Sequence, residues 1–349
     1  MQVKRLVVYA SLLLGAVTSF SASAQLTEEQ ETEYLNGLYQ NAIEAGEKEV
    51  VVFAPTVGLS RPLYAAFHER FPKLAVQNVA ATGPALVVRM QAEQAAGKYS
   101  ADVLSSTDAD SLSMYRNGWL QAFFPKTAEG LAEKYHGKDG QWLAYSFSVG
   151  GVIVNNKVTA GERPKVWKDL VEERWRGQAA IETPGHLLGS TLRLLVAKRN
   201  GVIDDAWLEK FKDLSPGIYP TGTAVTNAVV SGQRSMNPTA GYQVFKGAKD
   251  RGAPVSFIFL QDGIPTLSNT IQIFKNAPNP NAAKLWMAWY FSREAQALNA
   301  KHVYLVGTMP FAPAVEGVPA DGKLLESGWQ MYETELEPWR KEFEDLFKR

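Results

Sequence analysis

Residues 50–71, VVVFAPTVGLSRPLYAAFHERF, contain the pattern that decides the fold class. The run Val50–Phe53 is apolar and rich in β-branched residues, as in a buried strand, and it stops at Ala54-Pro55-Thr56-Val57-Gly58. Apolar residues then recur at helical spacing from Leu63 to Phe71. The stretch therefore predicts a strand, a turn and a helix.

The same strand–turn–helix pattern recurs along the chain. Residues 74–79 lead into Thr82-Gly83-Pro84 and a helix, and residues 101–104 lead into Ser105-Ser106-Thr107 and a helix. Another set of such units begins at residues 179–182. Repeated units of this kind form mostly parallel sheets with helices on their faces. The sequence therefore predicts an α/β protein with two lobes, each built on its own sheet.

Other stretches indicate the remaining elements. Residues 142–154 form a long strand pattern with Gly150-Gly151 at its middle, which fits either a bulge or a crossover between lobes. Residues 235–236 fit a strand that turns at residues 237–241 before the next helix. Further along we expect strands at 255–260 and 270–274 around a turn at 262–265, a helix at 281–301 and a surface helix at 329–347.

The first 24 residues have the pattern of a signal peptide. Lys4 and Arg5 precede the apolar run Leu6–Val17, and Ala22-Ser23-Ala24 supplies small residues for cleavage after Ala24. The apolar run is shorter than the roughly 20 residues that span a bilayer, which argues against a membrane anchor. No Cys follows the cleavage position, so a lipid anchor is excluded. We therefore expect export to a compartment such as a bacterial periplasm, without insertion into the membrane.

Composition excludes several classes of protein. The 349 residues include 36 Lys and Arg, 36 Asp and Glu and no Cys. Without net charge or a basic run, a nucleic-acid partner is not expected, because phosphate binding needs a concentrated cationic patch. The absence of Cys removes disulfides, thiol nucleophiles, iron–sulfur clusters and thiolate zinc sites.

The candidate site lies in the turns that follow the strands. Ligands of open parallel sheets bind outside the carboxyl ends of the strands, where helices begin with free N–H groups. These turns hold hydroxyls and glycines, which also serve as ordinary helix caps. We expect a ligand-binding cleft between two lobes that face each other. An anionic group of the ligand would bind at the N-terminus of the helix that begins at Ser190. The candidate ligand-binding residues are Thr56, Thr82, Gly83, Ser105, Ser106, Ser148, Gly189, Ser190, Thr191, Thr223 and Tyr242.

The sequence offers little for catalysis. It has no Gly-x-Ser-x-Gly string, no Gly-x-Gly-x-x-Gly string and no phosphate-binding loop. No two of the four His have the spacing of a zinc site. Asp108 and Asp110 are interpreted as residues that cap a helix and lie on a solvated face. We therefore predict no catalytic residue, no metal site and no cofactor.

A set of motifs resembles one family. They are Val50–Phe53 with the helix to Phe71, Ala101-Asp102-Val103, Trp167–Leu170 ahead of Trp175–Ile181, Val229–Gly232, Lys249–Val255 and Asn276–Leu285. Over residues 50–315 the chain is similar to periplasmic substrate-binding proteins of ABC transporters, in the branch with ferric-ion, thiamine, phosphonate and polyamine binders.

The resemblance implies a fold and a set of partners. It implies a two-lobe periplasmic binding protein of type II, whose lobes close on a ligand by a hinge motion. The lobes would comprise residues 25–148 plus 263–349 and residues 149–262. The implied partners are a small-molecule ligand and the permease of an ABC transporter, and the receptor would act as a monomer without enzymatic activity.

The stretch Thr239–Tyr242 departs from the ferric members of the family. Those members have a pair of adjacent tyrosines there, and this chain has Tyr242 alone. Because Fe³⁺ prefers several anionic oxygens, a ferric-ion receptor is the second choice. The first is a receptor for a small polar, anionic organic molecule, with Arg61, Arg89 and Arg193 near the turns. Tyr242 would either cover the ligand or pack on its own helix. A secreted enzyme with a dispersed site is the third alternative.

Overall fold

The computed structural model describes residues 25–55, 58, 60–158, 163–184 and 189–348. The signal peptide expected at residues 1–24 and the candidate residue Thr56 lie outside these ranges. In the described ranges, no helix is long and apolar enough to span a bilayer.

The helices and strands alternate through most of the chain. The helices are α1 Glu28–Glu44, α2 Arg61–Arg70, α3 Gly83–Ala96, α4 Asp108–Arg116, α5 Gly189–Arg199, α6 Asp205–Asp213, α7 Gly222–Val230, α8 Tyr242–Asp250, α9 Pro280–Tyr290, α10 Arg293–Leu298, α11 Trp329–Thr334 and α12 Leu336–Phe347. The strands are β1 Glu49–Ala54, β2 Ala75–Ala80, β3 Val103–Thr107, β4 Leu120–Gln121, β5 Leu143–Asn155, β6 Ala180–Glu182, β7 Gly217–Tyr219, β8 Met236–Gly241, β9 Val255–Ile258, β10 Ile264–Phe274, β11 Val306–Gly307 and β12 Leu324–Leu325.

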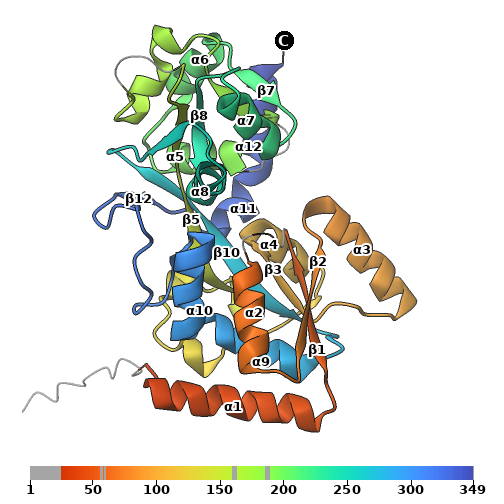
Figure 1. The fold of residues 1–349 in the computed structure, drawn as a ribbon. Coiled ribbons are helices and arrows are strands. Elements are labelled where there is room, and N and C mark those ends of the chain that lie inside the picture. Colours follow the sequence, from red (N-terminus) through yellow and green to blue (C-terminus); the bar gives the residue numbers. More distant parts are fainter. Residues whose placement is uncertain (1–24, 56–57, 59, 159–162, 185–188, 349) are drawn as a thin grey trace, which may run out of the picture.

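The elements gather into two lobes that β5 and β10 connect (Figure 1). The first lobe contains β1, β2 and β3 with α1 to α4, α9 and α10. The second contains β6, β7 and β8 with α5 to α8. The predicted two-lobe α/β organisation is therefore confirmed.

The sheet is mixed, whereas a mostly parallel sheet was expected in each lobe. β1 is parallel to β2 and β3, and β6 is parallel to β7. β10 is antiparallel to both β3 and β5, and β8 and β9 are antiparallel to β5. The strand–turn–helix units produced the parallel pairs as predicted. Each of these antiparallel pairs involves β5 or β10, the two connecting strands.

Gly150 and Gly151 lie where β5 passes between the lobes. A Cβ atom on Gly150 would lie 2.4 Å from Cδ of Arg193, and one on Gly151 would lie 2.4 Å from Cε1 of Phe257. The pairing of β5 with β8 also shifts register between Gly151 and Ile153. The bulge and the crossover that the sequence left open are therefore both present, and glycine is needed because neighbouring side chains fill the space.

Several expected boundaries are wrong. Residues 105–107 and 264–265, expected in turns, belong to β3 and β10. Residues 237–241, expected as a turn, belong to β8, because pairing with β5 holds them extended. Pro238 lies opposite the register shift between Gly151 and Ile153. A residue without a backbone N–H is tolerated at such a position. The helix expected at 281–301 is broken, because the Ser292 hydroxyl caps the N-terminus of α10 by accepting from Ala295 N at 3.2 Å.

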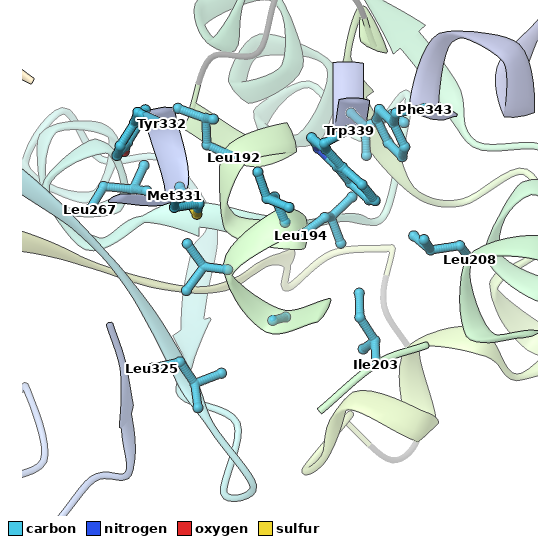
Figure 2. Close-up of a cluster of buried hydrophobic side chains, with 14 of the residues drawn as sticks. Leu192, Leu194, Ile203, Leu208, Leu267, Leu325, Met331, Tyr332, Trp339 and Phe343 are labelled. Carbon is cyan, nitrogen blue, oxygen red and sulfur yellow. The ribbon is translucent and has the colours of Figure 1, made fainter. Parts of the chain in front are cut away.

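The segment 329–347, which we name the C-terminal strap, bridges the lobes. It forms α11 and α12, joined at Glu335, instead of one surface helix. α11 packs on α4 in the first lobe and α12 packs on α6 in the second. Figure 2 shows Trp339 and Phe343 of α12 in a buried cluster that also holds Leu208 of α6. The predicted lobe boundaries stay a prediction, and on these contacts we propose that α12 belongs with the second lobe.

Candidate functional site between the lobes

Ser105 and Ser106 are buried at the end of β3 and point to opposite faces of the sheet. Ser105 Oγ lies 3.3 Å from the Tyr145 hydroxyl, while Ser106 Oγ donates to Asp110 Oδ2 at 2.5 Å. Successive strand residues alternate between faces, so one ligand group cannot contact both hydroxyls from one side. The structure does not bring these two candidates together.

Two buried carboxylates stand at the start of α4 in the first lobe. Asp108 is 3% exposed and accepts from Trp142 Nε1 at 2.9 Å, and Asp110 is 9% exposed and accepts from Gly83 N at 3.0 Å. Burial raises the pKa of Asp108 to about 6 and also raises the pKa of Asp110. The interpretation of this pair as solvated was wrong, because the sheet and α11 cover α4.

The N-terminus of α5 in the second lobe already holds an anion, the carboxylate of Glu182 at the end of β6. Both the backbone N–H and the hydroxyl of Ser190 donate to Glu182 Oε2 at 2.8 Å. Thr239 Oγ1 donates to the Ser190 carbonyl at 2.9 Å, and Thr191 is fully buried. The expected anion site at this helix is thus occupied by the chain itself, and ligand binding by Gly189, Ser190 and Thr191 stays a prediction.

Arg193 lies one turn into α5 and places a cation between the lobes. It is 4% exposed, and its Nη2 donates to Ser148 Oγ on β5 at 2.9 Å. Its Nε is buried without a hydrogen-bond partner, and no described carboxylate forms an ion pair with it. Burial lowers the pKa of Arg193 to about 10 against the opposing effect of Glu182, so the guanidinium stays charged at neutral pH.

Two glycines make room for the Arg193 side chain. A Cβ atom on Gly241, the residue that precedes α8, would lie 3.1 Å from Nη2 of Arg193, and Gly150 is similarly close to Cδ. The guanidinium therefore reaches from α5 to β5 and to the N-terminus of α8, where backbone N–H groups add partial positive charge. Arg89, by contrast, pairs with Glu93 at 3.0 Å within the first lobe.

Tyr242 packs among aromatic side chains. Its ring centroid lies 5.2 Å from that of Phe257 and 5.3 Å from that of Phe259. Its hydroxyl donates to the Glu316 carbonyl at 2.9 Å, and burial raises its pKa. Of the two roles expected for Tyr242, these contacts favour packing over contact with a ligand.

The remaining candidates are dispersed. Thr82 is half-buried just before α3, and Gly83 takes a φ of +63° where it donates to Asp110. Thr223 is exposed on α7. Sequence reasoning missed Glu182, because a lone Glu at a strand end carries no pattern that marks a site. Among the described residues, no group of three His, Asp or Glu side chains could hold a metal ion.

Comparisons with known proteins agree with this geometry. Residues 63–333 match the family model described as bacterial extracellular solute-binding protein. A probable ABC transporter periplasmic-binding protein, y4fP of Sinorhizobium fredii, is 25% identical over 259 residues, which cover 69% of this chain and 71% of that protein.

Solved structures share the two-lobe fold. Iron-bound HitA from Pseudomonas aeruginosa is 16% identical with a TM-score of 0.71, over 84% of this chain and 99% of that chain. AfuA from Actinobacillus pleuropneumoniae, with fructose-6-phosphate bound, is 16% identical with a TM-score of 0.70, over 86% and 99%. The family match covers most of the chain, and it carries the function of solute binding. The chain belongs to the bacterial extracellular solute-binding proteins.

Proposed function

We propose that this protein is an exported receptor that binds a small anionic organic molecule between its lobes and delivers it to an ABC transporter permease. The observation that carries the proposal is the buried cation Arg193, which no described carboxylate pairs with. It lies beside β5, the strand that passes between the lobes, and beside the N-terminus of α8.

A buried charge without a partner costs free energy. A guanidinium removed from water is stable only when an anion and hydrogen-bond acceptors replace the lost solvation. Glu182 acts on Arg193 through space but forms no ion pair within 4.0 Å, and its Oε2 accepts from Ser190. A carboxylate or phosphate on the solute would supply the missing charge, and both have oxygens that match the planar fork of a guanidinium.

A ferric ion is the competing solute. HitA, which shares the fold, is iron-bound, and AfuA is bound to a phosphorylated sugar. A ferric site needs several anionic oxygens. The Tyr242 hydroxyl donates to the Glu316 carbonyl, and burial raises its pKa, which disfavours the phenolate that a ferric ion would bind. These contacts support an organic anion over iron.

The test compares two arginines on the same helix. Thermal shift with succinate, citrate, glycerol 3-phosphate, fructose 6-phosphate, taurine and 2-aminoethylphosphonate selects the probe that stabilises the protein most, and calorimetry then gives its Kd. We expect Arg193→Gln to raise Kd by about 10- to 100-fold, since a hydrogen bond to a charged group contributes about 1.5 to 3 kcal/mol. The ligand-free melting temperature should not fall, because the change removes an unpaired buried charge.

Arg199→Gln is the matched control. Arg199 ends α5, is about a third exposed and pairs with Glu335 on the C-terminal strap. It should bind the probe with wild-type Kd. An unchanged Kd for Arg193→Gln would overturn the proposal, as would the absence of binding to every probe. A visible band with ferric citrate that Tyr242→Phe abolishes would replace the proposal with iron.

A further inference from the structure

A row of three uncharged polar side chains crosses the sheet where β3 ends and β5 and β10 continue toward the second lobe (Figure 1). Asn269 on β10 pairs with Thr107, the last residue of β3, and with Ser146 on β5. Residues directly opposite each other on neighbouring strands point to the same face of a sheet. We name Thr107, Asn269 and Ser146 the polar row.

The polar row lies on the face of the sheet that Arg193 contacts. Ser148 follows Ser146 by two residues on β5, and the pairing with β10 is regular between them. Side chains two residues apart on a strand point to the same face, roughly 7 Å from each other. Ser148 Oγ accepts a hydrogen bond from Arg193 Nη2 at 2.9 Å. The guanidinium from the second lobe therefore lies close to the polar row of the first lobe, at a separation that a small organic molecule can span.

The residues next to the polar row point to the opposite face of the sheet, where two carboxylates lie. Ser106 donates to Asp110 Oδ2 at 2.5 Å, and the Ser268 hydroxyl bonds to the Asp108 carboxyl. Successive strand residues alternate between faces, so these carboxylates lie across the sheet from the polar row. The polar row itself carries no charge. It therefore offers no counter-charge to a second anionic group or to an ammonium group of a solute.

The polar row has hydrogen-bonding capacity for a ligand. Thr107 and Asn269 are partly exposed. The Thr107 hydroxyl does not cap α4, and Asn269 Nδ2 reaches Ser146 Oγ only at 3.4 Å, beyond the usual range of about 2.7 to 3.2 Å. A threonine hydroxyl and an asparagine amide each offer both a donor and an acceptor. A hydroxyl group, which also donates and accepts without charge, matches this pair.

We propose that Asn269 and Thr107 bind a hydroxyl group of the solute whose anionic group pairs with Arg193. The inference rests on the proposed function and narrows the solute to a hydroxylated anion, such as a polyol phosphate or a hydroxy acid. The hydroxyl contacts come from the first lobe and the charge contact from the second. One solute molecule therefore bridges the lobes, and both ends of it contribute to affinity.

The test combines variants of the polar row with probes that differ in hydroxyl groups. Each hydroxylated probe has an analogue without hydroxyls: propyl phosphate for glycerol 3-phosphate, hexyl phosphate for fructose 6-phosphate and tricarballylate for citrate. The thermal-shift screen should select one of the three hydroxylated probes. Calorimetry should then show that the wild type binds this probe more tightly than its analogue.

Asn269→Ala removes the amide, and Thr107→Val keeps the shape of the side chain while removing its hydroxyl. Each variant should raise the Kd of the selected probe by about 2- to 10-fold, as expected for a hydrogen bond between uncharged groups. Each should bind the analogue with the wild-type Kd, because the analogue has no hydroxyl to lose. Asn36→Ala, at an exposed position of α1, is the matched control and should bind both ligands as the wild type does.

The outcomes separate the two proposals. If Arg193→Gln weakens binding of both ligands, and Asn269→Ala and Thr107→Val weaken only that of the hydroxylated probe, the inference is supported. If Arg193→Gln weakens binding but both variants of the polar row leave Kd unchanged, or weaken the analogue equally, the inference is wrong and the proposed function stands. Selection of succinate, taurine or 2-aminoethylphosphonate as the tightest probe would also overturn the inference alone. If Arg193→Gln leaves Kd unchanged, the proposed function fails and the inference fails with it.

Discussion

The buried carboxylates of the site accept hydrogen bonds from other groups of the chain, whereas the Arg193 cation forms no ion pair with a described carboxylate. Carboxylates favour helix N-termini because N–H groups there carry partial positive charge. Asp110 accepts from Gly83 at α3, Glu182 from Ser190 at α5 and Glu47 from Ala282 at α9. Arg193 has no such arrangement with an anion among the described residues. The solute's charge is therefore inferred from Arg193, a buried cation that forms no ion pair with any described carboxylate.

Asp108 supplies a prediction about pH. Burial raises its pKa to about 6 in the folded protein, whereas an unfolded Asp has a value of about 3.9. The folded state binds this proton more tightly, so stability falls as pH rises from about 4 to about 6 and stays lower above that range. Asp108→Asn keeps an oxygen acceptor for Trp142 and cannot titrate. At pH 7.5 we expect it to be about 1 to 3 kcal/mol more stable than the wild type.

The measurement is urea unfolding at several pH values. The difference between Asp108→Asn and the wild type should shrink as the pH falls below about 4, where the Asp108 carboxyl becomes protonated in the unfolded state as well as in the folded state. Asp321→Asn, at an exposed position, should follow the wild type at every pH. A difference that does not change with pH would contradict the assignment to Asp108.

Individual elements show why the C-terminal strap is part of the core and not a surface helix. Trp339 and Phe343 stack with ring centroids 5.0 Å apart, and Phe343 is fully buried. Phe347 extends the same face toward Phe211 of α6, at 6.5 Å. The polar residues of the amphipathic pattern face solvent, while the apolar stripe finds a partner on the second lobe. Attachment of α12 therefore depends on apolar burial.

Phe343→Ala tests that attachment. Truncating a fully buried Phe costs about 3 to 5 kcal/mol, through lost burial and the cavity left behind. Denaturant unfolding should show a loss of this size, whereas Lys341→Ala, an exposed position of the same helix, should change stability by less than about 0.5 kcal/mol. A loss below about 1 kcal/mol for Phe343→Ala would mean that α12 is only loosely docked.

The whole molecule is arranged as lobes on two long strands, with the strap as a further connection. β5 pairs with β10 over residues 143–149 and with β8 and β9 beyond them, and every residue of β5 is buried. Hinge strands of this kind permit one lobe to rotate against the other while each keeps its core. The fold and the family both fit a receptor that changes shape around its solute.

We expect the whole protein to bind its solute without converting it chemically. Mature protein incubated overnight with the selected probe should hold one molecule per chain and return it with unchanged mass, because the chain lacks the nucleophile and nucleotide-loop motifs of the common enzyme classes. Small-angle scattering should show a smaller radius of gyration when the probe is present. Steady formation of a product, detected by mass spectrometry, would instead indicate an enzyme.

The sequence by itself determined the elements whose signals are local. Runs such as Val50–Phe53 and the helical spacing after it predicted β1 and α2, and repetition of the pattern predicted two α/β lobes. Gly150-Gly151 marked the crossing of β5. These predictions succeeded because periodicity and turn residues act over a few positions in the chain. The same local rules misplaced β8 and the break at Ser292, where pairing and capping overrode the pattern.

Only the tertiary structure decided which polar groups are already paired. Glu182 occupies the α5 N-terminus, where the sequence predicted a ligand, and Asp108 is buried although its surroundings in sequence are polar. Arg193 and Ser148 are 45 residues apart in the chain. Whether a buried charge has a partner depends on elements that meet only after folding, and burial fixes the energy of that charge. A hydroxyl or a cation in the sequence is therefore only a candidate, and its packed neighbours determine whether it can bind a solute.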